Sequence, residues 1–442
     1  MLDRDISTAD ALALLSVGDG DDDRAAVDRR RFLKLIGMGL GAGAIGSVLG
    51  SPLVERFMPG YDAAAWAAGP IGPADGILVV IGMYGGNDGL NTVVPVSDPN
   101  YATQHGSIAL TAANTLAIDA DTGLHPNLTE VKRRWDLGQV AIVEGLGYPT
   151  PDLSHFTSMA TWMSGRPGAT PTSGWMGRWL DGHLAGSRDL FAAAAIGGSV
   201  PLTVIGAAST ATGVPSSRPT FGADLTAAET LRSTTIRSMV TPARGALYQA
   251  VGASFVDALD VGKALAPVIP DPLVATGALS KSMEVGAHLV NANLGFRVLT
   301  VGWGDFDSHA GQTYMHGQRM LELDEGIRRF YEVLAPEWAG RVTIMTFSEF
   351  GRTSWSNSSG GTDHGTSAPH FVIGNNVRGG RYGQRPSLAG LARWQRPAYH
   401  VDLRSYYASI LDGWMGGGSS ELLGGTFENL GLFTAGPGQP IA

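Results

Sequence analysis

The 442-residue sequence lacks cysteine entirely. Disulfide bonds, thiolate zinc sites, iron–sulfur clusters and a cysteine nucleophile are therefore excluded together. Charged residues are also scarce, at 16% of the chain, and acids outnumber bases to give a formal net charge of -9. Because binding to a phosphate backbone requires a surplus of Lys and Arg, this composition argues against nucleic acid as a partner.

The sequence also has no long polar tract and no regular glycine repeat. Hydrophobic residues make up 44% of the chain, which is enough to bury a substantial core and excludes wholesale disorder. Glycine is abundant, at 62 residues, but without a G-X-Y period it predicts turns and close backbone approaches, not collagen. We therefore expect one large globular domain in most of the chain.

A basic head precedes a weakly apolar segment near the N-terminus. Arg29 and Arg30 are followed by Arg-Phe-Leu-Lys and then by an uncharged stretch at 35–53 that is rich in Gly and Ala. This pattern predicts a twin-arginine signal over residues 1–67, recognised by the twin-arginine translocase, with small residues at 63–68 for cleavage. A membrane anchor is the alternative, but the many glycines make the stretch less apolar than a stable span requires. We expect the mature chain, residues 68–442, to be exported to the periplasm, cell envelope or extracellular space, without a stable membrane span after processing.

Short apolar runs alternate with helical patterns along the mature chain. The apolar runs lie at 77–81, 140–143, 298–301, 342–347 and 370–373, and the helical patterns lie at 126–137, 154–163, 270–293, 314–334 and 403–415. The runs lack the strict alternation of a half-exposed strand. Strands buried on both faces and alternating with helices predict a three-layer α/β/α sandwich with a mostly parallel sheet. The segment 206–269 shows no clear strand, and we interpret it as a helical insertion or lid within a single domain.

Polar side chains follow most of the predicted strands, where ligands bind in open α/β sheets. These side chains are Asp88, Asp305, Asp307, His309, Glu349, Asp363 and His364. Carboxylates mixed with imidazoles suit zinc, manganese or another divalent ion. Each residue alone also has a structural interpretation, such as a turn residue for Asp88 or a helix cap for Asp307. Their common position beyond successive strands predicts a metal site.

Ser154 stands at the start of a predicted helix. Two roles fit this position: an N-cap, or a nucleophile for phosphoryl or sulfuryl transfer that the helix amides and a neighbouring metal assist. Arg352, after the 342–347 run, fits either a clamp for the transferred anion or a salt bridge. The sequence contains no G-x-S-x-G elbow and no Walker A loop.

Ordered motifs over nearly the whole mature chain resemble one bacterial family. They are Gly85-Gly-Asn-Asp88-Gly-Leu-Asn-Thr, His125-Pro, Gly147-Tyr-Pro, Ser154-His-Phe, Gly174-Trp-Met-Gly-Arg-Trp, Phe306-Asp-Ser-His309, Ser348-Glu-Phe-Gly-Arg-Thr and Gly361-Thr-Asp-His-Gly365. Together with the paired-arginine leader, they make the chain similar to the exported domain-of-unknown-function family fifteen-hundred-and-one, which is grouped with the alkaline phosphatase superfamily. This resemblance implies an alkaline phosphatase-like α/β/α sandwich with a two-metal site.

The resemblance also implies roles for individual residues. Ser154 resembles the nucleophile at a helix start, and Asp88 resembles the acid beside it that bridges the metals. One metal site is complete in this pattern, with Asp307, His309 and His364 as its ligands.

A second metal site is incomplete in this pattern. Glu349 resembles its acid, but Phe350 stands where the superfamily commonly has a histidine. Asp363 or His155 is then needed as a further ligand. Asp305 is an alternative acid for the first site because of its spacing. The resemblance therefore implies one or two divalent ions, which are zinc, manganese or calcium.

The leading functional hypothesis is an exported metal-dependent hydrolase of phosphate or sulfate esters, acting on a small-molecule or polysaccharide ester. The alternative is a non-catalytic cell-envelope or polysaccharide-binding protein on the same fold. It rests on the substitution by Phe350 and on aromatic residues near the predicted site that can stack on sugars. These residues are Tyr84, Tyr148, Trp162, Trp175, Trp179 and Trp303.

Replacing Arg29 and Arg30 together with Lys should block export, because these residues form the basic pair ahead of the apolar stretch. Unprocessed precursor should accumulate in the cytoplasm, as measured by cell fractionation and immunoblotting. Undiminished export of the double variant would contradict the targeting prediction.

Overall fold

One mixed sheet covered by helices on both faces makes up the body of the protein. The computed structural model describes residues 70–240 and 245–439. The predicted signal at 1–67, with Arg29, Arg30 and most of the small residues at its end, lies outside them. The strand order is β13-β5-β12-β9-β1-β8-β6-β7, and β14 also pairs with β5. The predicted three-layer α/β/α sandwich is therefore confirmed.

Strands and helices alternate along the chain. The strands of the main sheet are β1 (Ile77–Tyr84), β5 (Val140–Gly147), β6 (Ala193–Ile196), β7 (Thr212–Val214), β8 (Val298–Gly304), β9 (Val342–Phe347), β12 (Ala368–Ile373), β13 (Gly380–Gly383) and β14 (Val401–Asp402). The helices are α5 (Gly89–Thr92), α6 (Pro99–His105), α7 (Thr129–Asp136), α8 (His155–Ser164), α9 (Trp175–Leu184), α10 (Ala227–Met239), α11 (Gly245–Leu265), α12 (Ala278–Asn291), α13 (Gln312–Val333), α14 (Leu403–Trp414) and α15 (Ser419–Leu423). Outside the main sheet, β2 (Val93–Val94), β3 (Leu116–Ala117) and β4 (Gly123–Leu124) form a small sheet, and β10 (Arg352–Ser356) pairs with β11 (Thr362–His364).

The central strand β1 is apolar on both faces. It pairs in parallel with β8 on one side and with β9 on the other, so that Val79 lies opposite Leu299 and Ile344. β6 and β7 extend the parallel part beyond β8. Burial of β1 on both faces explains the unbroken apolar run in its sequence.

The strand β12 departs from the parallel arrangement. It runs antiparallel to both of its neighbours, β9 and β5, whereas β13 and β14 run parallel to β5. The expectation of a mostly parallel sheet is confirmed, with β12 as an exception. Because of its direction, the residues before β12 lie at the same edge as the residues that follow β1, β5, β8 and β9.

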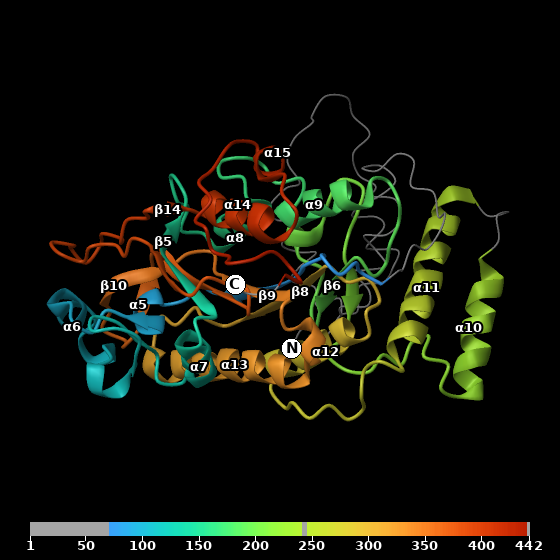
Figure 1. The fold of residues 1–442 in the computed structure, drawn as a ribbon, viewed down its shortest axis with the longest axis horizontal. Coiled ribbons are helices and arrows are strands. Elements are labelled where there is room, and N and C mark those ends of the chain that lie inside the picture. The colour runs from blue at the N-terminus through green and yellow to red at the C-terminus, as the bar shows by residue number, and fades with distance from the viewer. Residues whose placement is uncertain (1–69, 241–244, 440–442) are drawn as a thin grey trace, which may run out of the picture. The chain divides into compact units, whose positions relative to one another are not determined.

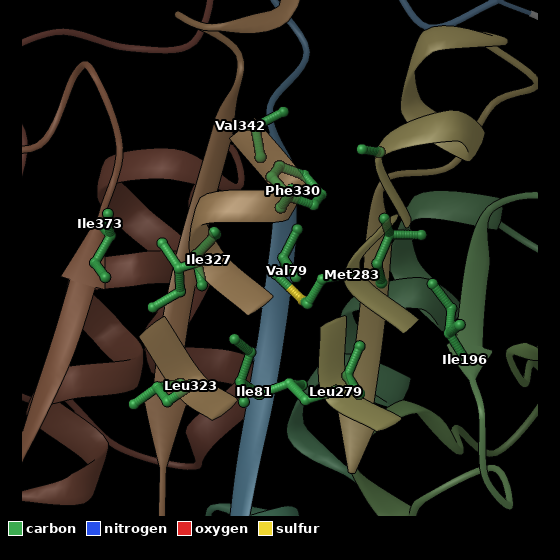
Figure 2. Close-up of a cluster of buried hydrophobic side chains, with 14 of the residues drawn as sticks. Val79, Ile81, Ile196, Leu279, Met283, Leu323, Ile327, Phe330, Val342 and Ile373 are labelled. Carbon is green, nitrogen blue, oxygen red and sulfur yellow. The ribbon is translucent and has the colours of Figure 1, made fainter. Parts of the chain in front are cut away.

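The two faces of the sheet carry separate hydrophobic layers. Val79 of β1 belongs to the layer formed with α7, α12 and α13, and its neighbour Leu78 belongs to the layer formed with α8, α9 and α14. Figure 2 shows Met283 of α12 and Phe330 of α13 over Val79. Figure 1 shows the two groups of helices on opposite sides of the sheet. Alternate side chains of one strand thus anchor both helical layers.

Several elements differ from the sequence expectations. The strand β7 lies within 206–269, where the sequence shows no clear strand. The rest of this segment contains α10 and α11, which Figure 1 shows beyond the β6 end of the sheet. The sequence also gave no indication of β6 or α9. None of the helices within residues 70–240 and 245–439 combines the length and hydropathy that crossing a membrane needs.

The expected helix at 270–293 is shorter, because α12 begins only at Ala278. Pro270 and Pro272 cannot donate helical hydrogen bonds, and each disfavours helical geometry in the residue before it. The carboxylate of Glu284 then accepts hydrogen bonds from the backbone of Val274 and Ala275, at 3.0 and 2.7 Å. The segment before α12 is thus held in an irregular conformation.

Candidate metal centre

Five segments meet at the edge of the sheet where β1, β5, β8 and β9 end. They are the loops after β1 and β8, the connection from β5 to α8, the residues after β9, and the β10–β11 hairpin. Hydrogen bonds join the first loop to the residues after β9 and the hairpin to the β5–α8 connection. The hairpin reaches this edge because β12 is antiparallel.

Three side chains from different segments form a potential metal-binding cluster. One ligand atom from each of His155, Asp307 and His364 lies within 4.8 Å of the others. His155 Nε2 is 3.4 Å from Asp307 Oδ2, and His364 Nε2 is 3.2 Å from Asp307 Oδ1. His155 begins α8, Asp307 follows β8, and His364 ends β11.

The imidazoles of His155 and His364 both direct Nε2 toward Asp307. His155 Nδ1 lies 2.8 Å from the Glu349 carboxylate, and His364 Nδ1 lies 2.9 Å from the Leu153 carbonyl. Both partners are acceptors, so each Nδ1 carries a proton, and in the neutral form of each ring the lone pair lies on Nε2. His155 Nε2 is buried and has no hydrogen-bond partner among the described residues. Such a partner on the far nitrogen is what orients histidine ligands at metal sites.

His309 and Asp363 border this cluster on its exposed side. His309 Nε2 lies 2.9 Å from Asp307 Oδ1 and 3.1 Å from His364 Nε2. Its other nitrogen lies 3.2 Å from the Asp363 carboxylate. Three imidazoles around one carboxylate fit zinc or manganese better than calcium, which prefers an all-oxygen set. The residues present therefore fit a divalent transition metal.

At neutral pH the cluster favours an ionised Asp307 carboxylate and a neutral His364 imidazole. Burial alone would raise the pKa of Asp307, but the hydrogen bond and charge of Arg352, with His364 and His309, lower it to about 2. The pKa of His364 is lowered, chiefly by burial. The hydrogen bond to Glu349 is the main cause that raises the pKa of His155. Metal binding would require His155 to release its second proton.

Glu349, expected as the acid of a second metal site, faces the protein instead. Its buried carboxylate accepts hydrogen bonds from Gly85 N at 2.8 Å and from Ser348 Oγ at 3.2 Å, in addition to the one from His155. The ring of Phe350 lies beneath the cluster, with its centroid 4.9 Å from that of His155. Glu349 thus orients His155, and Phe350 packs against the cluster.

Asp88 lies outside the cluster, in a buried ion pair. Its carboxylate lies 3.0 Å from His105 Nε2, accepts a hydrogen bond from Gln312, and caps the start of α5 through Leu90 N at 3.0 Å. His105 Nδ1 lies 2.6 Å from the Ser354 carbonyl, so both ring nitrogens face acceptors. Burial opposes ionisation of Asp88, but His105 lowers its pKa to about 2. The pKa of His105 is raised by Asp88 against the effect of burial.

Arg352 is also placed differently from the expected anion clamp. Its fully buried guanidinium donates to Asp307 Oδ1 at 2.6 Å, to Gly86 O at 2.7 Å, and to the carbonyls of Phe306 and Thr362 at 3.1 Å. It also donates to the carbonyl of Gly85. With its donors directed at protein acceptors, Arg352 positions Asp307 and the adjoining loops and cannot clamp a substrate anion.

Ser154 is the chain neighbour of the cluster residue His155. It is the N-cap residue of α8, between Leu153, whose carbonyl holds His364, and the cluster residue His155. Ser154 is exposed, and within the described chain its side chain makes no capping hydrogen bond. Asp305 is not in the cluster: it is exposed, with φ of 83°, and lies 3.7 Å from Arg319.

From the sequence, His155 is expected only as an alternative ligand. The signal for a stronger role is its position beside Ser154 at the predicted helix start. No pattern in the sequence indicates the roles of His105 and Gln312 around Asp88.

Comparison with known families supports the motif-based resemblance. Residues 76–405 match a family described as protein of unknown function (DUF1501). The chain belongs to the DUF1501 family. Among curated proteins, none matches this DUF1501 sequence significantly.

Several solved structures resemble this DUF1501 protein at low sequence identity. A protein in the alkaline phosphatase superfamily from Vibrio parahaemolyticus has a TM-score of 0.39 and 8% identity, covering 90% of this chain and 79% of that chain. The C-terminal periplasmic domain of EcEptC from Escherichia coli, in complex with Zn, has a TM-score of 0.36 and 6% identity, covering 79% and 84%. The alkaline phosphatase from the Antarctic bacterium TAB5 has a TM-score of 0.30 and 9% identity, covering 68% and 92%.

Replacing Asp307 with Asn should weaken zinc or manganese binding by about 10- to 100-fold or more, a range known for changes around metal ligands. Isothermal titration calorimetry and elemental analysis of the purified protein would measure this. Asp305→Asn is the matched control, because Asp305 is exposed and points to Arg319. Equal metal affinity of the two variants would contradict the proposed ligand set.

Replacing Asp88 with Asn should leave metal content unchanged but lower the free energy of unfolding by about 3 to 5 kcal/mol, because it leaves His105 without its buried counter-charge. Chemical denaturation would measure this loss. The pKa of Asp88 lies at about 2, below the ordinary 3.8. Its stabilising effect should therefore persist above about pH 4 and disappear as the pH falls towards 2. Loss of metal from a folded Asp88→Asn protein would show that Asp88 is a ligand.

Proposed function

We propose that this DUF1501 protein is an exported metal-dependent hydrolase of phosphate or sulfate esters. The observation that carries the proposal is the position of two imidazole nitrogens, His155 Nε2 and His364 Nε2, beside the carboxylate of Asp307. Ser154, whose side chain makes no capping hydrogen bond, is next to His155 in the chain. His155 Nε2 is available to a metal ion because it is buried and makes no hydrogen bond to the described residues. The resemblance of the ordered motifs to the alkaline phosphatase superfamily supports the same chemistry.

His155, Asp307 and His364 would hold the divalent ion, with His309 as a further ligand on the exposed side. A bound ion would supply positive charge that polarises a phosphate or sulfate ester and stabilises its developing negative charge. The protein residues prepare this site in advance. Glu349 holds His155 in orientation and Arg352 holds Asp307, so that little rearrangement is needed on binding.

Ser154 is proposed as the nucleophile. Its Oγ would form a bond to phosphorus or sulfur while the bond to the alcohol oxygen breaks, and the hydroxyl proton would pass through solvent to the departing alcohol. Water would then hydrolyse the serine ester and restore the hydroxyl. The backbone N–H groups at the start of α8 are suited to bind the anionic oxygens of the transferred group.

Export is proposed from the sequence of the leader. The paired arginines, Arg29 and Arg30, and the weakly apolar stretch behind them support recognition by the twin-arginine translocase. This route carries folded proteins and is compatible with a metal site assembled before export.

The non-catalytic polysaccharide-binding alternative loses its main support. Of the aromatic residues it relies on, Tyr148, Trp162, Trp175, Trp179 and Trp303 are buried. Tyr84 is only half-buried but packs with the hydrophobic layer of α8, α9 and α14. These rings stabilise the fold and leave little surface for stacking on a sugar.

Replacing Ser154 with Ala or Gly should abolish hydrolysis of 4-nitrophenyl phosphate or sulfate by several orders of magnitude while metal content stays unchanged. Stability should change little, because the Ser154 side chain makes no capping hydrogen bond to the described helix. Thr226→Ala is a contrasting control, because Thr226 does cap α10 through Glu229 N. It should cost about 1 kcal/mol of stability without affecting hydrolysis.

Steady-state kinetics, elemental analysis and thermal denaturation would test these expectations together. Parent-like hydrolysis by a metal-loaded Ser154→Gly protein would exclude Ser154 as the nucleophile. Failure of the metal-loaded parent to hydrolyse any phosphate or sulfate ester would count against the proposed activity.

A further inference from the structure

A long irregular segment, residues 384–400 between β13 and β14, borders the cluster of His155, Asp307 and His364. We call this segment the 384–400 loop. Trp355 Nε1 of β10 donates to Leu391 O at 2.7 Å, and Ser367 Oγ donates to Ala398 O at 3.0 Å. The hydroxyl of Thr366 donates to the carbonyl of Pro397. The loop is thus fixed along the β10–β11 hairpin. Loops that exceed about 12 to 15 residues without regular structure are uncommon and usually functional.

Arg396 connects this loop to His364 of the cluster. Its Nε donates to the backbone carbonyl of His364 at 3.0 Å, and one terminal nitrogen donates to the carbonyl of Trp394. The side chain is half-buried, and the described residues supply no carboxylate as an ion-pair partner. A guanidinium has five N–H groups, so donors remain for an external acceptor. Unlike the buried Arg352, Arg396 therefore has a positive charge that a substrate anion can reach.

Trp394 presents an exposed aromatic face in the same loop. Its side chain is 76% exposed, whereas Trp162, Trp175 and Trp414 are fully buried. The bond between its carbonyl and Arg396 fixes the two residues relative to each other. An exposed indole on an anchored backbone is a surface against which the apolar face of a ring can pack at small cost in conformational entropy.

We propose that the 384–400 loop is the substrate-binding wall of the metal centre and that the substrate is an anionic sugar ester. This inference rests on the proposed function. Arg396 binds the non-bridging oxygens of the phosphate or sulfate group, and Trp394 packs against the sugar ring. A guanidinium matches the geometry of such oxygens, and the non-polar face of a sugar ring matches an indole.

Calorimetric titration of the metal-loaded full-length chain tests this inference without requiring turnover. Ser154→Ala in every sample keeps a bound ester intact. The probes are glucose 6-phosphate, which has a ring, and glycerol 3-phosphate, which carries the same ester group without a ring. N-acetylglucosamine 6-sulfate serves as the sulfate counterpart of the first probe.

Trp394→Ala should weaken binding of the two sugar esters about tenfold and that of glycerol 3-phosphate less than twofold, and Trp394→Phe should restore most of the loss. Arg396→Gln should weaken all three about tenfold or more, as expected for a lost charge-assisted hydrogen bond. Arg393→Gln is the matched control, because it removes a positive charge from the same loop without a contact to His364. It should change each dissociation constant less than twofold.

Equal effects of Arg393→Gln and Arg396→Gln would overturn the inference, because they would indicate general attraction by the loop. Equal weakening of ring-bearing and acyclic esters by Trp394→Ala would also overturn it. Failure of the Ser154→Ala protein with an unchanged loop to bind any of the three esters would overturn it as well. Failure of the proposed function appears separately, as a parent chain that binds the esters but hydrolyses none of them.

Discussion

The site depends on the hydrogen bonds made by the buried guanidinium of Arg352. A charge without solvent is costly unless it is fully hydrogen-bonded and paired, and Arg352 meets both conditions through Asp307 and surrounding carbonyls. Two of these carbonyls belong to Gly85 and Gly86, with φ of 115° and 80°. A Cβ on Gly85 would lie 2.6 Å from backbone nitrogens of the β8 loop. Only glycine brings that carbonyl to the guanidinium, which then fixes the β1 loop, the β8 loop and the hairpin together.

The sequence predicted which polar residues gather at one edge of the sheet, but it did not predict the direction of β12. Strands buried on both faces show continuous apolar runs, and these runs located β1, β5, β8, β9 and β12. Periodicity carries no information on strand direction, however, and β12 is antiparallel. His364 precedes β12, so in a fully parallel sheet it would lie at the opposite edge. The alanine-rich β6 gave no signal because alanine favours strands weakly, so its place depends on packing between β8 and β7.

The sequence located the polar residues but could not assign their partners. Asp88 and Asp307 are the same residue type in equivalent loops, yet Asp88 faces His105 from α6 and Asp307 faces His155 and His364. Arg352 is buried among carbonyls, whereas Arg396 is only half-buried. This difference depends on the tertiary structure, and no local sequence pattern indicates it. The aromatic residues near the motifs were largely core residues, whereas the exposed Trp394 lies in an irregular loop without a recognisable motif.

The negative charges of Asp88 and Asp307 are balanced in different ways. Asp88 has an internal counter-ion, the protonated His105, and its surroundings are closed. Around Asp307, the carboxylates of Glu349 and Asp363 add to its own charge, and Arg352 supplies one fixed positive charge. The half-buried Arg396, which donates to the His364 carbonyl, adds a second positive charge, so that with neutral imidazoles three negative charges and two positive charges leave one negative charge unbalanced. Protonating the histidines would balance this excess but would remove the lone pairs that Glu349 and Leu153 orient. Under the proposed function, a divalent cation would offset the negative charge and use the lone pairs at once.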